Sequence, residues 1–88
     1  MYWVYILYSE RIDKYYIGAT SNLQNRVNFH NSDFNKIWTS RGKPWELVFS
    51  HKFETHKDAF AAERFIKKQK SRVFILKLIN EGWKEQTP

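Results

Sequence analysis

Three ionisable side chains fall where an amphipathic helix normally places apolar residues. In the helix expected over residues 21–31, a rotation of about 100° per residue puts Arg26 and His30 on the same face as Leu23. A later expected helix puts Glu63 among small apolar neighbours in the same way. A guanidinium binds phosphate, an imidazole transfers protons near neutral pH, and a carboxylate binds hard divalent cations. A sequence that places these three types on inward faces points to a requirement other than stability.

A purely structural interpretation of the same three residues stays open at this point. Burying an isolated charge is costly unless the charge is paired or binds a metal. Arg26 and Glu63 could meet that requirement by forming an ion pair, and His30 could be a hydrogen-bonded histidine of the core. The positions alone favour neither interpretation.

The composition narrows the class of protein. The chain has 88 residues, 42% of them hydrophobic and 18% aromatic, which suits a single domain over residues 1–88 and argues against a disordered chain. Fifteen Lys and Arg against nine Asp and Glu give a formal net charge of +6, which favours a polyanionic partner. The absence of Cys excludes a disulfide scaffold and a thiolate zinc site. With no apolar run near the roughly 20 residues of a membrane span and no signal peptide, we expect no membrane partner and a cytoplasmic location.

Three strands are expected from the pattern of apolar residues. The run from Tyr2 to Tyr8 is aromatic and β-branched and is apolar on both faces, which is typical of a strand in the middle of a sheet. A short polar stretch separates it from the run Lys14 to Gly18, which favours an antiparallel hairpin. Residues 32–43 are polar and look like an irregular loop, and partial alternation predicts a third strand over residues 45–53.

Three helices account for most of the remaining chain. The first, residues 21–31, begins with Ser21 and Gln24 in the spacing of a capping box. The second and third are expected over residues 55–68 and 72–81, where apolar residues recur at helical spacing. The order strand, strand, helix, strand, helix, helix predicts an α+β fold, with a small three-stranded antiparallel sheet flanked by helices.

Two of the five tyrosines stand out because of their neighbours. Tyr5 ends a Trp-Val-Tyr motif, and eleven residues later Tyr16 begins a Tyr-Ile-Gly motif, with Arg26 eight positions beyond that glycine. This ordered set, with a glutamate in a later helix, resembles the GIY-YIG nuclease superfamily over about residues 2–78. The stretch TSRGKPWELV at residues 39–48 is similar to one in small stand-alone bacterial members. The single domain of those members resembles the N-terminal nuclease domain of an excinuclease.

The resemblance implies a GIY-YIG-like fold and a metal-dependent endonuclease with DNA as its expected substrate. It also implies structure-specific cleavage in DNA repair or recombination. Under the resemblance, Tyr5 and Tyr16 are the two motif tyrosines, Arg26 the catalytic arginine, His30 the helix histidine, and Glu63 the ligand of Mg²⁺ or Mn²⁺. The chemistry does not say which tyrosine acts as base and which orients the water.

Two positions depart from the family pattern. Trp3 stands where the first motif of the family has glycine, a change that leaves the tyrosine of the motif in place. The late asparagine that many members place near the metal has Asn80 as its candidate here.

Under this resemblance, the excess of lysine and arginine over acidic residues is expected to serve nucleic-acid binding. A single lysine is more often simply solvated, but clustered lysines and arginines favour a shared surface that contacts phosphates without reading sequence. Trp38 and Trp45, beside the loop, could stack on unpaired bases, although packing in the strand is the simpler role for Trp45. The expected phosphate contacts are Lys36, Arg41 and Lys43 in the loop, and Lys67, Lys68, Lys70 and Arg72 at the junction of the last two helices.

Two other classes of function compete with the nuclease. A catalytically inactive nucleic-acid-binding module would use the same basic and aromatic surface, but it has no need for Glu63, because a carboxylate repels phosphate. A protein-interaction domain would show no salt-dependent affinity for DNA. The choice between DNA and RNA stays open, as does whether a protein partner or a homodimer supplies recognition of substrate shape.

Overall fold

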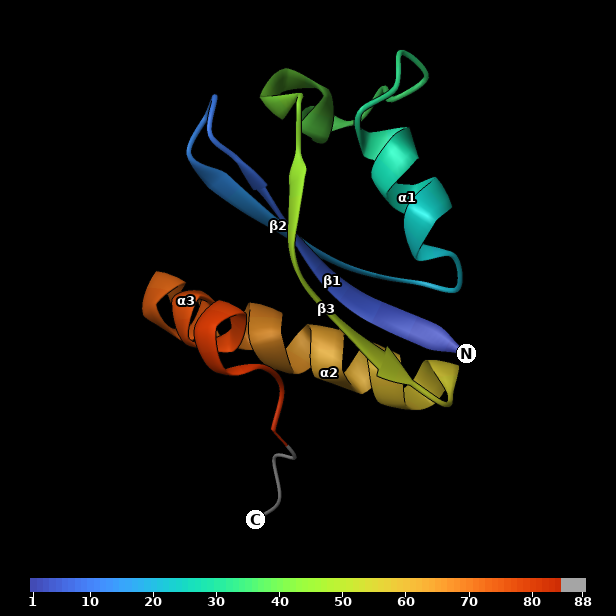
Figure 1. Ribbon diagram of the computed structural model, residues 1–88, viewed down its shortest axis with the longest axis vertical. Coiled ribbons are helices and arrows are strands. Elements are labelled where there is room, and N and C mark those ends of the chain that lie inside the picture. The colour runs from blue at the N-terminus through green and yellow to red at the C-terminus, as the bar shows by residue number, and fades with distance from the viewer. Residues whose placement is uncertain (85–88) are drawn as a thin grey trace.

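A three-stranded antiparallel sheet forms the centre of the protein (Figure 1). The structure, a computed structural model, describes residues 1–84. Its strands are β1 (Tyr2–Ser9), β2 (Lys14–Thr20) and β3 (Glu46–Phe53), in the order β2-β1-β3. Strand β1 is central, as its apolar residues on both faces predict, because a strand covered on both sides has no face left for water.

Helices cover both faces of this sheet. Helix α1 (Leu23–His30) lies on one face, and α2 (His56–Gln69) and α3 (Arg72–Glu81) lie on the other (Figure 1). This arrangement confirms the expected α+β class and the order of elements. Within residues 1–84, no helix combines the length and the apolar character needed to span a bilayer.

The alternation of side chains along β1 divides the core into two clusters. Val4 and Ile6 pack with Ile66 and other apolar residues of α2 and α3. Tyr5 and Leu7 point the other way and pack with the apolar residues of α1. Because neighbouring strand residues face opposite sides, the motif tyrosine is directed toward α1.

Helix α1 begins one residue later than the capping-box pattern predicts. The cap is Asn22, whose Oδ1 accepts a hydrogen bond from the backbone N–H of Asn25 at 3.0 Å, so the assignment to Ser21 is wrong. The backbone N–H of Asn22 in turn donates to Thr20 Oγ1 at 3.1 Å at the end of β2. Ser and Asn both cap helices well, so residue type does not choose between Ser21 and Asn22. The contact with Thr20 favours Asn22.

The segment expected to be an irregular loop contains a 3-10 helix, η1 (Trp38–Gly42). Tertiary contacts hold it in place: the Trp45 indole N–H donates to the Thr39 carbonyl at 2.6 Å, and a Cβ at Gly42 would lie 2.6 Å from the Trp45 ring. At the end of α1, Asn31 donates to the Trp45 carbonyl at 3.0 Å and accepts from its N–H at 2.6 Å. These contacts come from residues outside η1, so the pattern within the segment itself did not predict the helix.

Candidate active site

The two motif tyrosines point to the same face of the sheet. Tyr5 pairs with Gly18 and Leu7 pairs with Tyr16 in the β1–β2 register, and the two tyrosine rings lie 6.2 Å apart between centroids. A Cβ at Gly18 would lie 2.6 Å from Tyr5 Oη and 2.7 Å from Cζ. Glycine is therefore required by the close approach of the Tyr5 ring.

His30, the last residue of α1, contacts both tyrosines. The imidazole is fully buried, and its Nε2 lies 3.2 Å from Tyr5 Oη. Its ring centroid lies 4.5 Å from that of Tyr16. The helical position that looked anomalous in the sequence therefore brings an imidazole onto the motif tyrosines.

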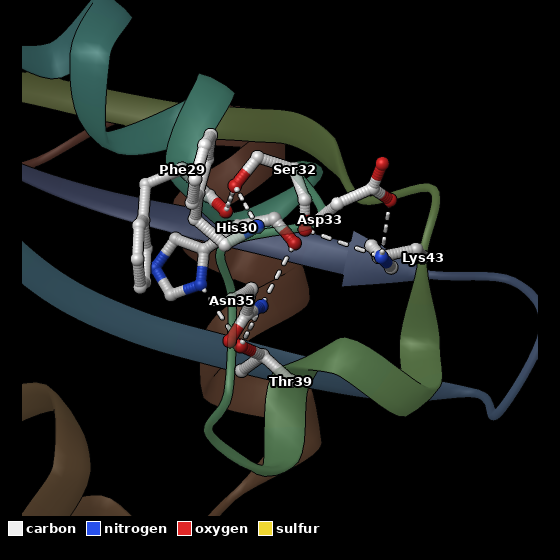
Figure 2. A network of polar contacts seen from close by, with 8 residues as sticks. Phe29, His30, Ser32, Asp33, Asn35, Thr39 and Lys43 are labelled. Carbon is white, nitrogen blue, oxygen red and sulfur yellow. Dashed lines mark hydrogen bonds and ion pairs between the residues drawn. The ribbon is translucent and has the colours of Figure 1, made fainter.

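A second set of buried polar residues holds the other side of His30 (Figure 2). The Nδ1 atom of His30 lies 3.1 Å from Thr39 Oγ1 in η1. The Asn35 side-chain amide donates to Thr39 Oγ1 at 2.8 Å and to the His30 carbonyl at 2.9 Å. Sequence reasoning missed both Asn35 and Thr39, because they lie in the segment expected to be irregular. The only sequence signal was that Thr39 opens the stretch TSRGKPWELV.

Burial sets the charge state of this cluster. Desolvation, followed by the positive charge of Arg26, lowers the pKa of His30 to about 4, so the imidazole is neutral at pH 7. Desolvation, followed by the effect of Tyr16, raises the pKa of Tyr5 well above its usual value, and the nearby Arg26 guanidinium opposes that shift. Tyr5 is therefore a protonated phenol at neutral pH.

Arg26 lies half-buried on α1 beside this cluster. Its guanidinium lies 4.8 Å from the centroid of the Phe29 ring, a cation–π arrangement that orients the planar fork. Within residues 1–84, Arg26 forms no ion pair with Glu63, which removes the structural ion pair as an explanation for the two residues.

Glu63 is a buried carboxylate on α2, with 9% of its surface exposed. Its Oε2 lies 2.7 Å from Nζ of Lys67, one helical turn later. The negative charge of Glu63 contributes to the raised pKa of Tyr5, so the two groups are within electrostatic range. The described residues hold no group of three His, Asp or Glu side chains that could enclose a metal ion.

The residues expected to contact phosphates divide into two sets. Three already have partners within the protein. Lys43 donates to the Ser32 carbonyl and lies near Asp33, and Lys67 pairs with Glu63. Arg72 forms two hydrogen bonds with the Asp13 carboxylate and one with the Asp13 backbone carbonyl. The other four are exposed and form no ion pair within the described part of the chain: Lys36, Arg41, Lys68 and Lys70.

The aromatic residues near the site differ in exposure. Trp38 is 48% exposed and its ring centroid lies 5.9 Å from that of Tyr16. Phe34, in the same segment, is 84% exposed. Trp45 is buried and serves packing, as the simpler interpretation predicts. Asn80 is exposed on α3.

The sequence and the structure both match known proteins. Residues 1–78 match the model of the GIY-YIG catalytic domain. A UPF0213 protein of Pediococcus acidilactici is 38% identical over 69 residues, which cover 76% of this chain and 70% of that protein. A UPF0213 protein of Clostridium perfringens is 34% identical, covering 92% of this chain and 90% of the relative.

A solved structure has the same fold. The solution NMR structure of the UPF0213 protein BH0048 from Bacillus halodurans aligns with a TM-score of 0.58 and 27% sequence identity, covering 93% of this chain and 87% of that chain. The match over residues 1–78 exceeds half of the sequence and contains both tyrosine motifs, Arg26, His30 and Glu63. The chain therefore belongs to the GIY-YIG nuclease family, alongside small UPF0213 proteins.

Proposed function

We propose that this protein is a divalent-cation-dependent endonuclease that hydrolyses phosphodiester bonds in DNA. The observation that carries the proposal is the cluster at His30, where Tyr5 lies within hydrogen-bond distance and Tyr16 packs on the imidazole. Arg26, on the same helix, influences the pKa of both Tyr5 and His30, so its charge acts at this cluster. Membership of a nuclease family supports the same conclusion.

The roles follow from the chemistry of each group. Arg26 presents a planar guanidinium fork, so it binds the scissile phosphate and stabilises the negative charge that develops during hydrolysis. Tyr5 is a protonated phenol at neutral pH, and burial raises its pKa further, so it acts as a hydrogen-bond donor that orients the phosphate or the attacking water. Tyr16, half-buried at the edge of the cluster, completes the binding site beside Trp38.

Glu63 is the residue that would hold the cation. Mg²⁺ in phosphate-processing sites takes one or two carboxylates and keeps several waters, so a single buried carboxylate fits its requirements. The cation would neutralise charge on the nonbridging oxygens and acidify water for the attack. Lys67 balances the charge of Glu63 at 2.7 Å, and a bound cation would take over that role.

Exposed residues beside the cluster suit DNA with unpaired bases. Trp38 presents half of its surface next to Tyr16, and Phe34 is almost fully exposed in the same segment. Both can stack on bases that have left a duplex, and Lys36 and Arg41 are placed in the same segment to bind the backbone. We therefore propose branched or flapped DNA as the substrate, with a role in repair or recombination.

A cleavage panel tests the proposal. Branched, flapped, single-stranded and duplex DNA are incubated with the protein in Mg²⁺, in Mn²⁺ or in a chelator, and the products are resolved on a denaturing gel. We expect cation-dependent cleavage that Arg26→Ala and Glu63→Ala reduce by at least about 100-fold. Arg64→Ala and Glu54→Ala are the matched controls, because both residues are exposed. Cleavage that is equal in all five proteins would overturn the proposal.

The inactive binding module is a second candidate, favoured by one contact. Lys67 already neutralises the Glu63 carboxylate, which gives Glu63 a structural role without a cation. On this candidate the protein binds DNA with a steep dependence on salt, and neither Mg²⁺ nor Glu63→Ala changes the affinity. The cleavage panel separates the two functions.

A further inference from the structure

The side-chain amide of Asn35 has only one orientation that satisfies its neighbours. One end lies 2.9 Å from the His30 carbonyl, which can only accept, so that end is the NH₂ group. The other end accepts from the Ile37 backbone N–H at 3.0 Å, so that end is the oxygen. The NH₂ group of Asn35 therefore donates its second hydrogen to Thr39 Oγ1 at 2.8 Å.

This donation fixes the direction of the Thr39 hydroxyl. Thr39 is fully buried, and a buried hydroxyl proton is costly to leave without an acceptor. The contacts of Oγ1 within residues 1–84 are Asn35 Nδ2, which cannot accept, and His30 Nδ1 at 3.1 Å. The Thr39 hydroxyl therefore donates to His30 Nδ1.

From this chain of contacts we infer that Thr39 and Asn35 are positioning residues that hold His30 in the tautomer with its proton on Nε2. A neutral imidazole that accepts at Nδ1 carries its single proton on Nε2. That N–H then donates to Tyr5 Oη at 3.2 Å, and the Tyr5 oxygen acts as the acceptor. The hydrogen bonds run in one direction, from Asn35 through Thr39 and His30 to Tyr5.

The direction has a consequence at the site, which rests on the proposed function. Because Tyr5 accepts from His30, the Tyr5 hydroxyl proton points away from the imidazole and is available to a phosphate oxygen or a water. His30 is thereby a donor that orients Tyr5 and not the base that removes a proton from water. The opposite tautomer would turn the Tyr5 proton inward and leave the Thr39 hydroxyl without an acceptor.

The same contacts explain why the stretch TSRGKPWELV contains these residue types. The indole N–H of Trp45 donates to the Thr39 carbonyl, and the Trp45 ring occupies the space beside Gly42. The carbonyl of Gly42 accepts from Ser9 Oγ at 2.7 Å, which ties η1 to β1. These residues place the Thr39 hydroxyl against the imidazole.

Nuclear magnetic resonance reads the tautomer directly and needs no substrate. Two-bond ¹H–¹⁵N correlations are recorded at about pH 7.5 on the ¹⁵N-labelled protein, and the signals of His30 are assigned by their loss in His30→Gln. We expect a protonated Nε2 and an unprotonated Nδ1. A protonated Nδ1 in the unaltered protein overturns the inference, whatever the activity of the protein.

Two substitutions of similar size test the role of Thr39. Thr39→Val removes the hydroxyl, so we expect a fall in the Nε2–H population, and Thr39→Ser should restore it. The Trp45 indole signal checks that η1 is intact, because that N–H bonds to the backbone of residue 39. Retention of a pure Nε2–H tautomer in Thr39→Val would show that Thr39 does not fix it.

A kinetic readout separates positioning from substrate binding. If the protein cleaves DNA, Thr39→Val should lower kcat by roughly 10–100-fold with little change in KM, and Thr39→Ser should restore kcat. A raised KM with unchanged kcat would contradict the positioning role. A protein that shows the expected tautomer but no cleavage overturns the proposed nuclease and leaves this inference standing.

Discussion

Tyr5 lies across from Gly18 in the β1–β2 pair, and its phenol ring occupies the space where any larger residue would place its Cβ. The Tyr5 hydroxyl also lies 3.2 Å from Nε2 of His30. The motif glycine and the motif tyrosine are therefore one structural unit, because the first leaves the room that the second fills.

Gly18→Ala tests this relationship. The new Cβ would lie 2.6 Å from Tyr5 Oη, so the ring must move in a region that is already packed. We expect a loss of about 1–3 kcal/mol in the free energy of unfolding and a fall in kcat of roughly 100-fold. Urea unfolding and cleavage assays measure the two effects. Ala19→Gly, on the opposite face of the same strand, is the control. Normal kcat in Gly18→Ala would mean that the position of Tyr5 is unimportant for cleavage.

Stability should depend on pH through His30. Burial lowers its pKa to about 4 in the folded protein, against about 6.5 in an unfolded chain. Between these values the unfolded state binds the extra proton, so the free energy of unfolding falls as the pH drops from about 6.5 to 4. The loss attributable to His30 is about 3 kcal/mol at most.

Urea unfolding at pH 7 and pH 5 measures this loss in the unaltered protein and in His30→Gln. The difference between the two pH values should shrink in His30→Gln and persist in His56→Gln, an exposed histidine. An equal pH dependence in all three proteins would contradict the buried, neutral state of His30.

The basic residues should contribute unequally to DNA binding. Lys36 and Arg41 are exposed and have no ion pair among residues 1–84, whereas Arg72 is bound to Asp13 through both the side chain and the carbonyl of Asp13. Lys36→Gln and Arg41→Gln should each weaken binding and reduce the slope of log K against log salt by about 1. Arg72→Gln removes the same charge but should leave the slope nearly unchanged. Fluorescence anisotropy titrations at several salt concentrations give the slopes, and equal slopes for all three variants would contradict this division.

Trp38 should determine the preference for unpaired bases. Its half-exposed ring next to Tyr16 can stack on a base that a duplex keeps hidden. Trp38→Ala should weaken binding to flapped or single-stranded DNA by roughly 10-fold, in line with about 1–3 kcal/mol per stacked base, and leave duplex affinity nearly unchanged. Trp38→Phe should retain much of the preference because it keeps an aromatic face. An equal loss for both kinds of DNA would point to a role in packing instead.

The sequence was sufficient to predict the sheet, because hydrophobic burial follows the residue pattern directly. Strand β1 is apolar on both faces and lies at the centre, and helices α2 and α3 begin and end within about one residue of the expected bounds. The errors lie where two neighbouring residues of similar type compete, as at Ser21 and Asn22, and where distant contacts create structure, as in η1.

The sequence pointed to the ionisable groups of the candidate site, but it did not point to the polar residues around them. Arg26, His30 and Glu63 could be found because a charge on an apolar helix face breaks the pattern. Asn35 and Thr39 could not, because short polar residues in a polar segment break no pattern. Their importance depends on hydrogen bonds that only the folded chain brings together.

The bridge from the Asn31 side chain to both backbone groups of Trp45 joins the two ends of the segment 32–44. Its two ends are held together independently of what lies between them, so extra residues near the exposed Phe34 would extend outward without disturbing the sheet. The part around Phe34 can be lengthened while Thr39 stays in place, because Thr39 is held separately by His30 and Trp45. If the protein is a nuclease as proposed, changes around Phe34 would alter its substrate preference without any change in Tyr5, His30 or Arg26.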